Sequence, residues 1–321
     1  MTKRRILALD GGGIKGTFSA SFLAQLEKKL QHPIAHYFDL IVGTSTGGII
    51  ALGLGLGLSA ADLLSFYVTA GPEIFCRRSR IPLWTRLGMG KYDPDRLRHH
   101  LTQSFGDRLF GESRSRLVIP SVDLDTGEVR LFKTAHAPRL MTDLCRSAID
   151  VALATAAAPS YFPPHRLPTG VPLVDGGICA GNPTGLAVCE AVGVLGWERE
   201  SLRVLSIGTT RSPLDIGRGG LLDWHRRVWI HKLVDLMIAC QSSYSLGTAS
   251  ILVGEANLFR IDPVAPSGRF KLDSHKHIDS LIGLGDTFAR QEIPRLSSVF
   301  FEEPAMPFEP CIAASDRVAG G

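Results

Sequence analysis

The stretch FDLIVGTSTGGIIALGLGLGL, residues 38–58, passes from an apolar strand through a glycine turn into an apolar helix. Its first five residues predict a buried strand, and the glycines that follow break that strand before the helical run begins. Within the turn, Gly43-Thr44-Ser45-Thr46-Gly47 fits the G-x-S-x-G pattern, in which a sharp turn exposes a serine hydroxyl above the end of the sheet. We therefore predict Ser45 as a nucleophile on an elbow formed by Gly43 and Gly47; the alternative is a glycine turn with an ordinary helix-capping serine.

A second glycine-rich segment, Asp10-Gly11-Gly12-Gly13-Ile14-Lys15-Gly16, follows an apolar strand at residues 6–9 and precedes a helix predicted over residues 17–30. Backbone N–H groups in such a turn point at whatever binds there. Candidates for an oxyanion hole are therefore Gly11, Gly12, Gly13, Lys15 and Gly16. The alternative is a dinucleotide site, because the segment also fits G-x-G-x-x-G. That site needs an acidic residue about twenty positions on, and residues 30–36 contain none.

A serine nucleophile needs a proton acceptor, and the sequence offers several candidates. Asp175-Gly176-Gly177 follows a brief strand at residues 173–174, and Gly176 and Gly177 would allow a close approach to the nucleophile. Asp10 is also followed by glycines, so spacing alone cannot choose between the two carboxylates. The histidines downstream are His225, His231, His275 and His277. Their contexts are a probable helix for the first two and a polar turn for the others, and neither context places a side chain at the end of a strand.

Strands and helices alternate over nearly the whole length, which predicts an α/β fold with a mostly parallel central sheet and helices on both faces. The further strands are expected at residues 117–122, 129–133, 203–207 and 257–261. The further helices are expected near residues 49–58, 60–75, 144–158, 183 onward, 221–246 and 278–296. We expect residues 1–303 to form one domain and residues 304–321 to form a poorly ordered tail.

The composition excludes some classes of protein. The chain has 321 residues with a net charge of +4, which is far from the strongly basic balance of a nucleic-acid-binding domain. Its six cysteines contain no C-x-x-C pair and no metal-ligand spacing with histidine, so we expect reduced thiols, a cytoplasmic location, no metal and no cofactor. The apolar run at residues 49–58 is about half of a membrane span. Any membrane contact is therefore expected to be peripheral.

Residues 76–92 form a basic segment that also carries apolar and aromatic side chains. Arg77, Arg78, Arg80 and Arg86 lie there together with Trp84. Arginines could meet lipid phosphate while the tryptophan enters the membrane interface. A solvated surface loop with one buried tryptophan explains the same composition equally well.

Four motifs together resemble the patatin-like phospholipases. They are the glycine-rich segment at residues 10–16, the elbow at residues 43–47, the run Ala154-Thr155-Ala156-Ala157-Ala158-Pro159-Ser160-Tyr161-Phe162, and Asp175-Gly176-Gly177. The resemblance covers roughly residues 5–210. It implies the patatin-like three-layer fold, a dyad of Ser45 and Asp175 without histidine, an oxyanion hole at Gly11 to Gly13 and their neighbours, and a structural role for Asp10.

The resemblance also implies a reaction, namely phospholipase A-type cleavage of phospholipid esters through an acyl-enzyme. Burial should raise the pKa of Asp175, because an ordinary carboxylate is a poor base at pH 7. Short members of this family include effectors that cyclic nucleotides switch on in anti-phage signalling, which suggests a cyclic nucleotide activator and action at the inner face of the membrane. The alternatives are an acyltransferase that uses the same dyad and a non-enzymatic module that binds a nucleotide or a lipid.

Overall fold

One mixed β-sheet organises the chain. The computed structural model describes residues 3–76, 90–213 and 226–312, and in the helix that begins at residue 226 the side chains of residues 226–232 and 234 lie outside this description. The strand order is β5-β6-β3-β2-β1-β7-β8, with β4 paired to β3. The strands are β1 (Arg4–Leu9), β2 (Leu40–Gly43), β3 (Leu117–Asp123), β4 (Val129–Lys133), β5 (His165–Arg166), β6 (Pro172–Asp175), β7 (Leu202–Ile207) and β8 (Leu258–Ile261).

The centre of the sheet is parallel. β1 pairs in parallel with β2 on one side and with β7 on the other, and β8 and β3 continue this arrangement outward. Leu9 aligns with both Gly43 and Ile207, so the carboxyl ends of the three central strands lie at one edge. β4, β5 and β6 pair antiparallel. The predicted mostly parallel sheet is confirmed, and the strands expected at residues 117–122 and 129–133 pair antiparallel as a hairpin. The antiparallel pairing of β6 with β3 and β5 was not predicted.

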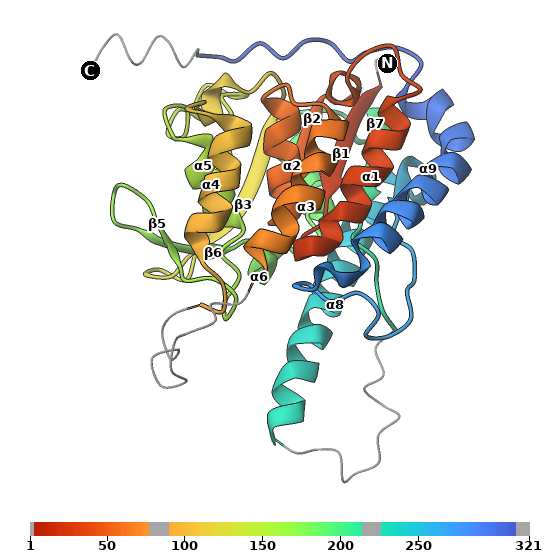
Figure 1. Cartoon of the computed structure of the whole chain (residues 1–321). Helices are drawn as coiled ribbons and strands as arrows, with labels where there is room; N and C mark the ends of the chain where they lie inside the picture. The colour runs from red at the N-terminus through yellow and green to blue at the C-terminus, as the bar shows by residue number, and fades with distance from the viewer. Residues whose placement is uncertain (1–2, 77–89, 214–225, 313–321) are drawn as a thin grey trace.

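Helices cover both faces, as the alternating pattern of β1 requires. Leu7 and Leu9 pack into one apolar cluster with α1, α2, α3, α4, α5 and α9, and Ile6 and Ala8 pack into another with α7 and α8. The helices are α1 (Gly16–Glu27), α2 (Thr46–Gly55), α3 (Ala60–Ile74), α4 (Pro94–Phe105), α5 (Ala148–Thr155), α6 (Gly177–Ala180), α7 (Thr184–Gly193), α8 (Arg226–Val253) and α9 (Ile278–Phe300). The three-layer arrangement is visible in Figure 1.

Helix α4 was not predicted from the sequence. Asp93 caps it by accepting a hydrogen bond from the N–H of Asp95, and Pro94 occupies its first turn. Its large buried apolar side chains, Leu97, Leu101 and Phe105, recur every four residues, so a helical signal was present in the sequence and was overlooked. Most of the membrane loop predicted at residues 76–92 lies outside the described residues, because these leave out residues 77–89.

Helix α8 ends at Val253, later than the predicted residue 246, and the predicted start at residues 221–225 lies outside the described residues. In Figure 1 its amino-terminal half projects from the body at the end of the molecule where β1 and β2 finish. Among the described residues, one segment, Asp235–Val253 within α8, is long and apolar enough to cross a membrane on length and composition alone. Only 11% of its apolar window is buried inside the protein. The sequence analysis overlooked this segment, because small polar residues dilute its hydrophobicity.

The carboxyl-terminal segment differs from the expectation of a poorly ordered tail from residue 304. Residues 304–312 form no helix or strand, but the N–H of Ala305 donates to His36 O at 2.7 Å and that of Cys311 donates to Ala135 O at 2.8 Å. The guanidinium of Arg116 also stacks on Phe308 at 5.0 Å. The expectation is therefore not met over residues 304–312, and residues 313–321 lie outside the described residues.

Candidate active site

Ser45 lies between the end of β2 and the start of α2, with φ of 55° and ψ of −120°. A positive φ costs a residue with a side chain on the order of 1–3 kcal/mol, so the surrounding structure must enforce it. The turn is too tight for side chains at its flanks. A Cβ on Gly43 would lie 2.1 Å from Gly47 O, and one on Gly47 would lie 2.3 Å from Leu9 O. The glycines of the elbow are therefore what allow the Ser45 side chain to stand at the end of β2.

Thr155 holds the backbone of this elbow. Its hydroxyl oxygen accepts a hydrogen bond from the Ser45 N–H at 3.0 Å and donates one to Pro120 O at 2.6 Å. Thr155 is fully buried, so water cannot replace either partner. It is the only hydroxyl in the run of residues 154–159, and a hydroxyl among alanines was the available signal. The sequence analysis gave it no role of its own.

Ser45 and Asp175 form a direct hydrogen bond although 130 residues separate them in the chain. The Ser45 Oγ donates to Asp175 Oδ2 at 2.7 Å. Asp175 is the last residue of β6, and β3 carries that strand to the elbow by pairing with both β6 and β2. The second carboxylate oxygen accepts the N–H of Gly177 at 2.6 Å. The antiparallel end of the sheet thus places the carboxylate at the nucleophile.

Asp175 lies at the end of a strand but is buried, unlike most aspartates. The side chain is buried, and burial raises the pKa of Asp175 to about 6, because a charge is poorly solvated there. The hydrogen bonds from Ser45 and from the Gly177 N–H act in the opposite direction and hold the pKa of Asp175 below the value that burial alone would give. A pKa near 6 leaves the carboxylate ionised at pH 7 and still makes it a stronger base than an exposed aspartate.

Asp10, the other candidate base, is directed away from Ser45. The Arg260 guanidinium donates to both of its carboxylate oxygens, at 2.9 Å to Oδ1 and 2.5 Å to Oδ2. Asp262 accepts from the same guanidinium at 3.0 Å. These two carboxylates raise the pKa of Arg260, which stays charged in spite of its burial. Asp10 thus anchors the start of the glycine-rich loop to β8, and Arg260 is a residue that the sequence analysis did not single out.

No described histidine is bonded to Ser45 or Asp175. His275 and His277 are exposed residues of a short 3₁₀ helix at the start of α9. His136 bonds to Glu190 at 2.9 Å, and His165 bonds to Asp150 at 3.1 Å. His225 and the side chain of His231 lie outside the described residues. Within the described part of the chain, the geometry favours a pair of residues over a triad.

The glycine-rich loop lies against the nucleophile, since a Cβ on Gly11 would be 3.3 Å from the Ser45 Cβ. Three of the predicted N–H donors already have acceptors. Gly11 donates to Gly181 O at 2.9 Å, Lys15 donates to Gly12 O at 3.1 Å, and Gly16 donates to the carbonyls of Gly13 and Ile14. In the part of the chain that the structure describes, the N–H groups of Gly12 and Gly13 have no acceptor. The expected set of five donors is therefore too broad, and two remain.

Lys15 and Gly16 have other roles in the structure. The Lys15 ammonium donates to Thr210 O at 2.9 Å, and burial lowers the pKa of this side chain. Gly16 lets α1 approach the elbow, because a Cβ there would lie 2.1 Å from the Thr46 hydroxyl oxygen. The described residues contain no group of three or more His, Cys, Asp or Glu side chains arranged to hold a metal ion. The groups assembled around Ser45 are those of acyl transfer.

The sequence is similar to those of several known proteins. A model of the patatin-like phospholipase family matches residues 7–188. A cGAMP-activated phospholipase of Pseudomonas aeruginosa is 38% identical over 271 residues, covering 83% of this chain and 80% of the relative. A cGAMP-activated phospholipase of Vibrio cholerae is 31% identical over 345 residues, covering 95% of this chain and 96% of the relative. Patatin-like protein 4 of Arabidopsis thaliana is 31% identical over 307 residues, covering 80% and 75%.

A sheet between two layers of helices, with a serine on a glycine elbow and a buried carboxylate beside it, defines the class of α/β serine hydrolases. Within that class, the chain belongs to the patatin-like phospholipase family. Members of this family are lipid acyl hydrolases, and the chain is an enzyme of the carboxylic ester hydrolase type. The matched residues contain Ser45 and Asp175 but not Arg260 or α8.

Proposed function

We propose that the chain cleaves the acyl esters of phospholipids with Ser45 as nucleophile and Asp175 as general base. Ser45 Oγ attacks the ester carbonyl while Asp175 takes its proton, and the N–H groups of Gly12 and Gly13 stabilise the oxyanion. Asp175 then returns the proton to the lysolipid oxygen as the ester bond breaks, leaving an acyl-enzyme. Water attacks the acyl-enzyme, Asp175 accepts the water proton, and Ser45 is regenerated when the fatty acid leaves.

The observation that carries this proposal is the 2.7 Å hydrogen bond between Ser45 Oγ and a carboxylate whose pKa burial raises to about 6. The hydroxyl proton already points at its acceptor, so the transfer needs no rearrangement. The Gly177 N–H fixes the other carboxylate oxygen and leaves Oδ2 for the serine. A histidine is not required, because the carboxylate itself has a basicity suited to neutral pH.

The test is fatty-acid release from vesicles of phosphatidylethanolamine and phosphatidylglycerol, followed by mass spectrometry of the products. Ser45→Ala is expected to lower the release by at least about 10³-fold, as loss of a nucleophile does. Asp175→Asn should be nearly as damaging. Ser65→Ala is the matched control, because Ser65 is an exposed serine of α3. With cyclic GMP–AMP present, release by Ser45→Ala at the rate of the Ser65→Ala control would overturn the proposal.

Regulation by a cyclic dinucleotide is the second part of the proposal. Relatives from Pseudomonas aeruginosa, Escherichia coli and Vibrio cholerae carry the name cGAMP-activated phospholipase, at 31–41% identity. We therefore propose cyclic GMP–AMP as an activator and antiviral defence as the setting. Fatty-acid release should rise on addition of cyclic GMP–AMP and stay unchanged with linear dinucleotides; equal rates with and without the cyclic compound would contradict this.

The proposed place of action is the cytoplasmic face of the membrane, where both the activator and the phospholipid are accessible. The six cysteines support a reducing compartment, because the structure contains free thiols at all six positions. Cell fractionation tests this proposal. The protein should occur in the soluble fraction and, when the activator is present, also on the membrane; recovery in the periplasm would contradict it.

A further inference from the structure

Helix α8 presents an apolar stripe to solvent. Leu233, Met237, Tyr244 and Ile251 are 43%, 62%, 78% and 86% exposed. Their spacing of four, seven and seven residues puts them on one face of the helix. Residues 236–253 contain no Asp, Glu, Lys or Arg, whereas the exposed face of a surface helix normally carries charges. Such an uncharged exposed face marks an interaction surface.

The side of α8 next to the stripe, not the one opposite it, is attached to the body. Gln241 accepts a hydrogen bond from the Gly181 N–H at 2.6 Å and donates one to Ile178 O at 2.8 Å. Farther along, Ser245 Oγ donates to Asn182 O at 2.7 Å, and Ala249 is fully buried against the sheet. These contacts hold the helix by one side. They involve residues 241–249 only, so the amino-terminal half of α8, which carries Leu233 and Met237, extends beyond the body (Figure 1) and is the part that would enter a membrane interface.

The attachment places α8 beside the catalytic pair. Gly181, which bonds to Gln241, also accepts the Gly11 N–H at 2.9 Å, so α8 and the glycine-rich loop share one contact residue. Ile178 lies three residues after Asp175 and is 51% exposed. In Figure 1, α8 projects from the end of the molecule at which β1 and β2 finish. A membrane that covers the projecting part of the stripe, with Leu233 and Met237, therefore lies at the same end of the molecule as the site.

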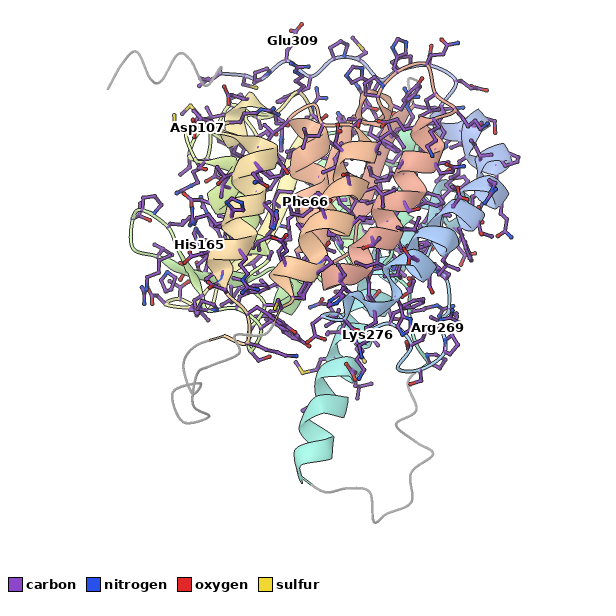
Figure 2. The ribbon with its side chains drawn as sticks, in the orientation of Figure 1. Phe66, Asp107, His165, Arg269, Lys276 and Glu309 are labelled. Atoms are coloured by element: carbon purple, nitrogen blue, oxygen red, sulfur yellow. The ribbon has the colours of Figure 1, made fainter. Side chains whose placement is uncertain are left out.

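A basic segment flanks the same end. Arg269, Lys271 and Lys276 are exposed, and Leu272 between them is 38% exposed. The carbonyl of Leu272 accepts the Ile14 N–H at 2.9 Å, which joins this segment to the glycine-rich loop. Figure 2 shows Arg269 and Lys276 at the end of the body from which α8 projects. Cations next to an apolar stripe complement a membrane surface with anionic headgroups.

We infer that the stripe of Leu233, Met237, Tyr244 and Ile251, together with the basic segment of residues 269–276, docks the enzyme on an anionic phospholipid bilayer. The inference rests on the proposed function, since docking here would bring the lipid ester to Ser45. A second copy of the chain is a weaker candidate for the same surface. Helix pairs in water usually carry charges beside the apolar seam, and residues 236–253 have none.

The test is flotation of the full chain with vesicles of phosphatidylethanolamine and phosphatidylglycerol, in a Ser45→Ala background that leaves the lipids intact. Met237→Asp should weaken vesicle binding on the order of tenfold or more, because burial of a methionine side chain is worth about 1.5–3 kcal/mol. Met237→Leu should retain binding. The matched control is Met306→Asp: Met306 is 68% exposed, and it belongs to the segment that passes over the opposite end, where Figure 2 labels Glu309. This control should bind like the parent chain.

A second arm tests the charge. Lys276→Glu should weaken binding about five-fold or more to vesicles with phosphatidylglycerol, and the loss should shrink as salt is added. Equal binding by Met237→Asp and Met306→Asp would overturn the inference. So would a Met237→Asp chain that loses self-association in analytical ultracentrifugation while its vesicle binding is unchanged, because a second copy would then occupy the stripe. Vesicle binding needs no catalysis, so hydrolysis of a short soluble ester by wild type and Ser45→Ala tests the proposed function separately.

Discussion

The burial that makes Asp175 a useful base should also make the folded protein less stable at neutral pH. Its pKa is raised from 3.8 to about 6 in the folded chain, whereas in the unfolded chain it takes the ordinary value. The folded state therefore holds this proton more tightly. The free energy of unfolding that the tighter proton binding contributes is fully present below pH 3.8 and is lost as the pH rises through 6. At pH 8 the cost is about two pKa units at about 1.4 kcal/mol each, which is about 3 kcal/mol.

Asp175→Asn removes that cost because the amide carries no charge and has nearly the same shape. The amide oxygen can still accept the Gly177 N–H, and the amide nitrogen can donate to Ser45 Oγ in place of the present bond. We expect the variant to be more stable than wild type at pH 8 by up to about 3 kcal/mol, which is roughly a 5 °C rise in Tm for a chain of this size. At pH 5 the gain should fall to about half, because the folded wild-type chain then keeps the proton.

The assay is urea unfolding of wild type and Asp175→Asn at pH 5 and pH 8, with fatty-acid release measured on the same preparations. Ser45→Ala is the control, since it removes a hydrogen bond to the carboxylate and leaves the buried charge in place. It should give no gain at pH 8. An Asp175→Asn chain that is no more stable than wild type at pH 8, or whose gain is the same at both values of pH, would refute the reasoning about burial.

Three further predictions concern the pair and its supports. For hydrolysis of a soluble ester, kcat/KM should reach half of its plateau near pH 6 and fall about tenfold per pH unit below that, because only ionised Asp175 accepts a proton. A flat profile from pH 5 to 8 would contradict the raised pKa of Asp175. Thr155→Val should lower the free energy of unfolding by about 1–3 kcal/mol, because it leaves the Ser45 N–H buried without an acceptor, whereas Thr155→Ser should keep most of the wild-type stability in urea unfolding. A Thr155→Val chain as stable as wild type would show that the hydroxyl does not support the elbow. Arg260→Met should lower the free energy of unfolding by about 3–5 kcal/mol, because it leaves Asp10 buried without its cation. Adding Asp10→Asn should restore part of that stability. A double variant as unstable as Arg260→Met would show that the ion pair is not the cause.

Local patterns predicted the parts of the site that local geometry creates. The apolar strand, the glycine turn and the apolar helix around Ser45 are all present, because a tight turn at residues 43–47 needs glycine wherever backbone atoms approach closely. The central parallel strands followed from the alternation of short apolar runs with helices. The strand at residues 173–174 was expected but its antiparallel pairing with β3 was not, and β5 was missed because two residues are too few for a periodic signal.

The residues that the sequence analysis missed act over long separations. Arg260 meets Asp10 across 250 positions, and nothing near residue 260 marks it as a partner of the glycine-rich loop. Nor could the sequence show that three of the five expected oxyanion donors already bond to other carbonyls. The bond from the Gly11 N–H to Gly181 O, for example, depends on the fold. Spacing left Asp10 and Asp175 equivalent as bases. The family resemblance favoured Asp175, and the structure shows its hydrogen bond to Ser45.

The central claim is that Ser45 is activated by Asp175, and labelling with a fluorophosphonate tests it most directly. Such a reagent forms a covalent adduct with an activated serine, and peptide mass spectrometry locates the adduct. We predict one adduct, on the peptide that contains Ser45, with labelling abolished in Ser45→Ala and slowed by at least about 10²-fold in Asp175→Asn. Labelling of Asp175→Asn at the wild-type rate, or an adduct on another residue, would contradict the account.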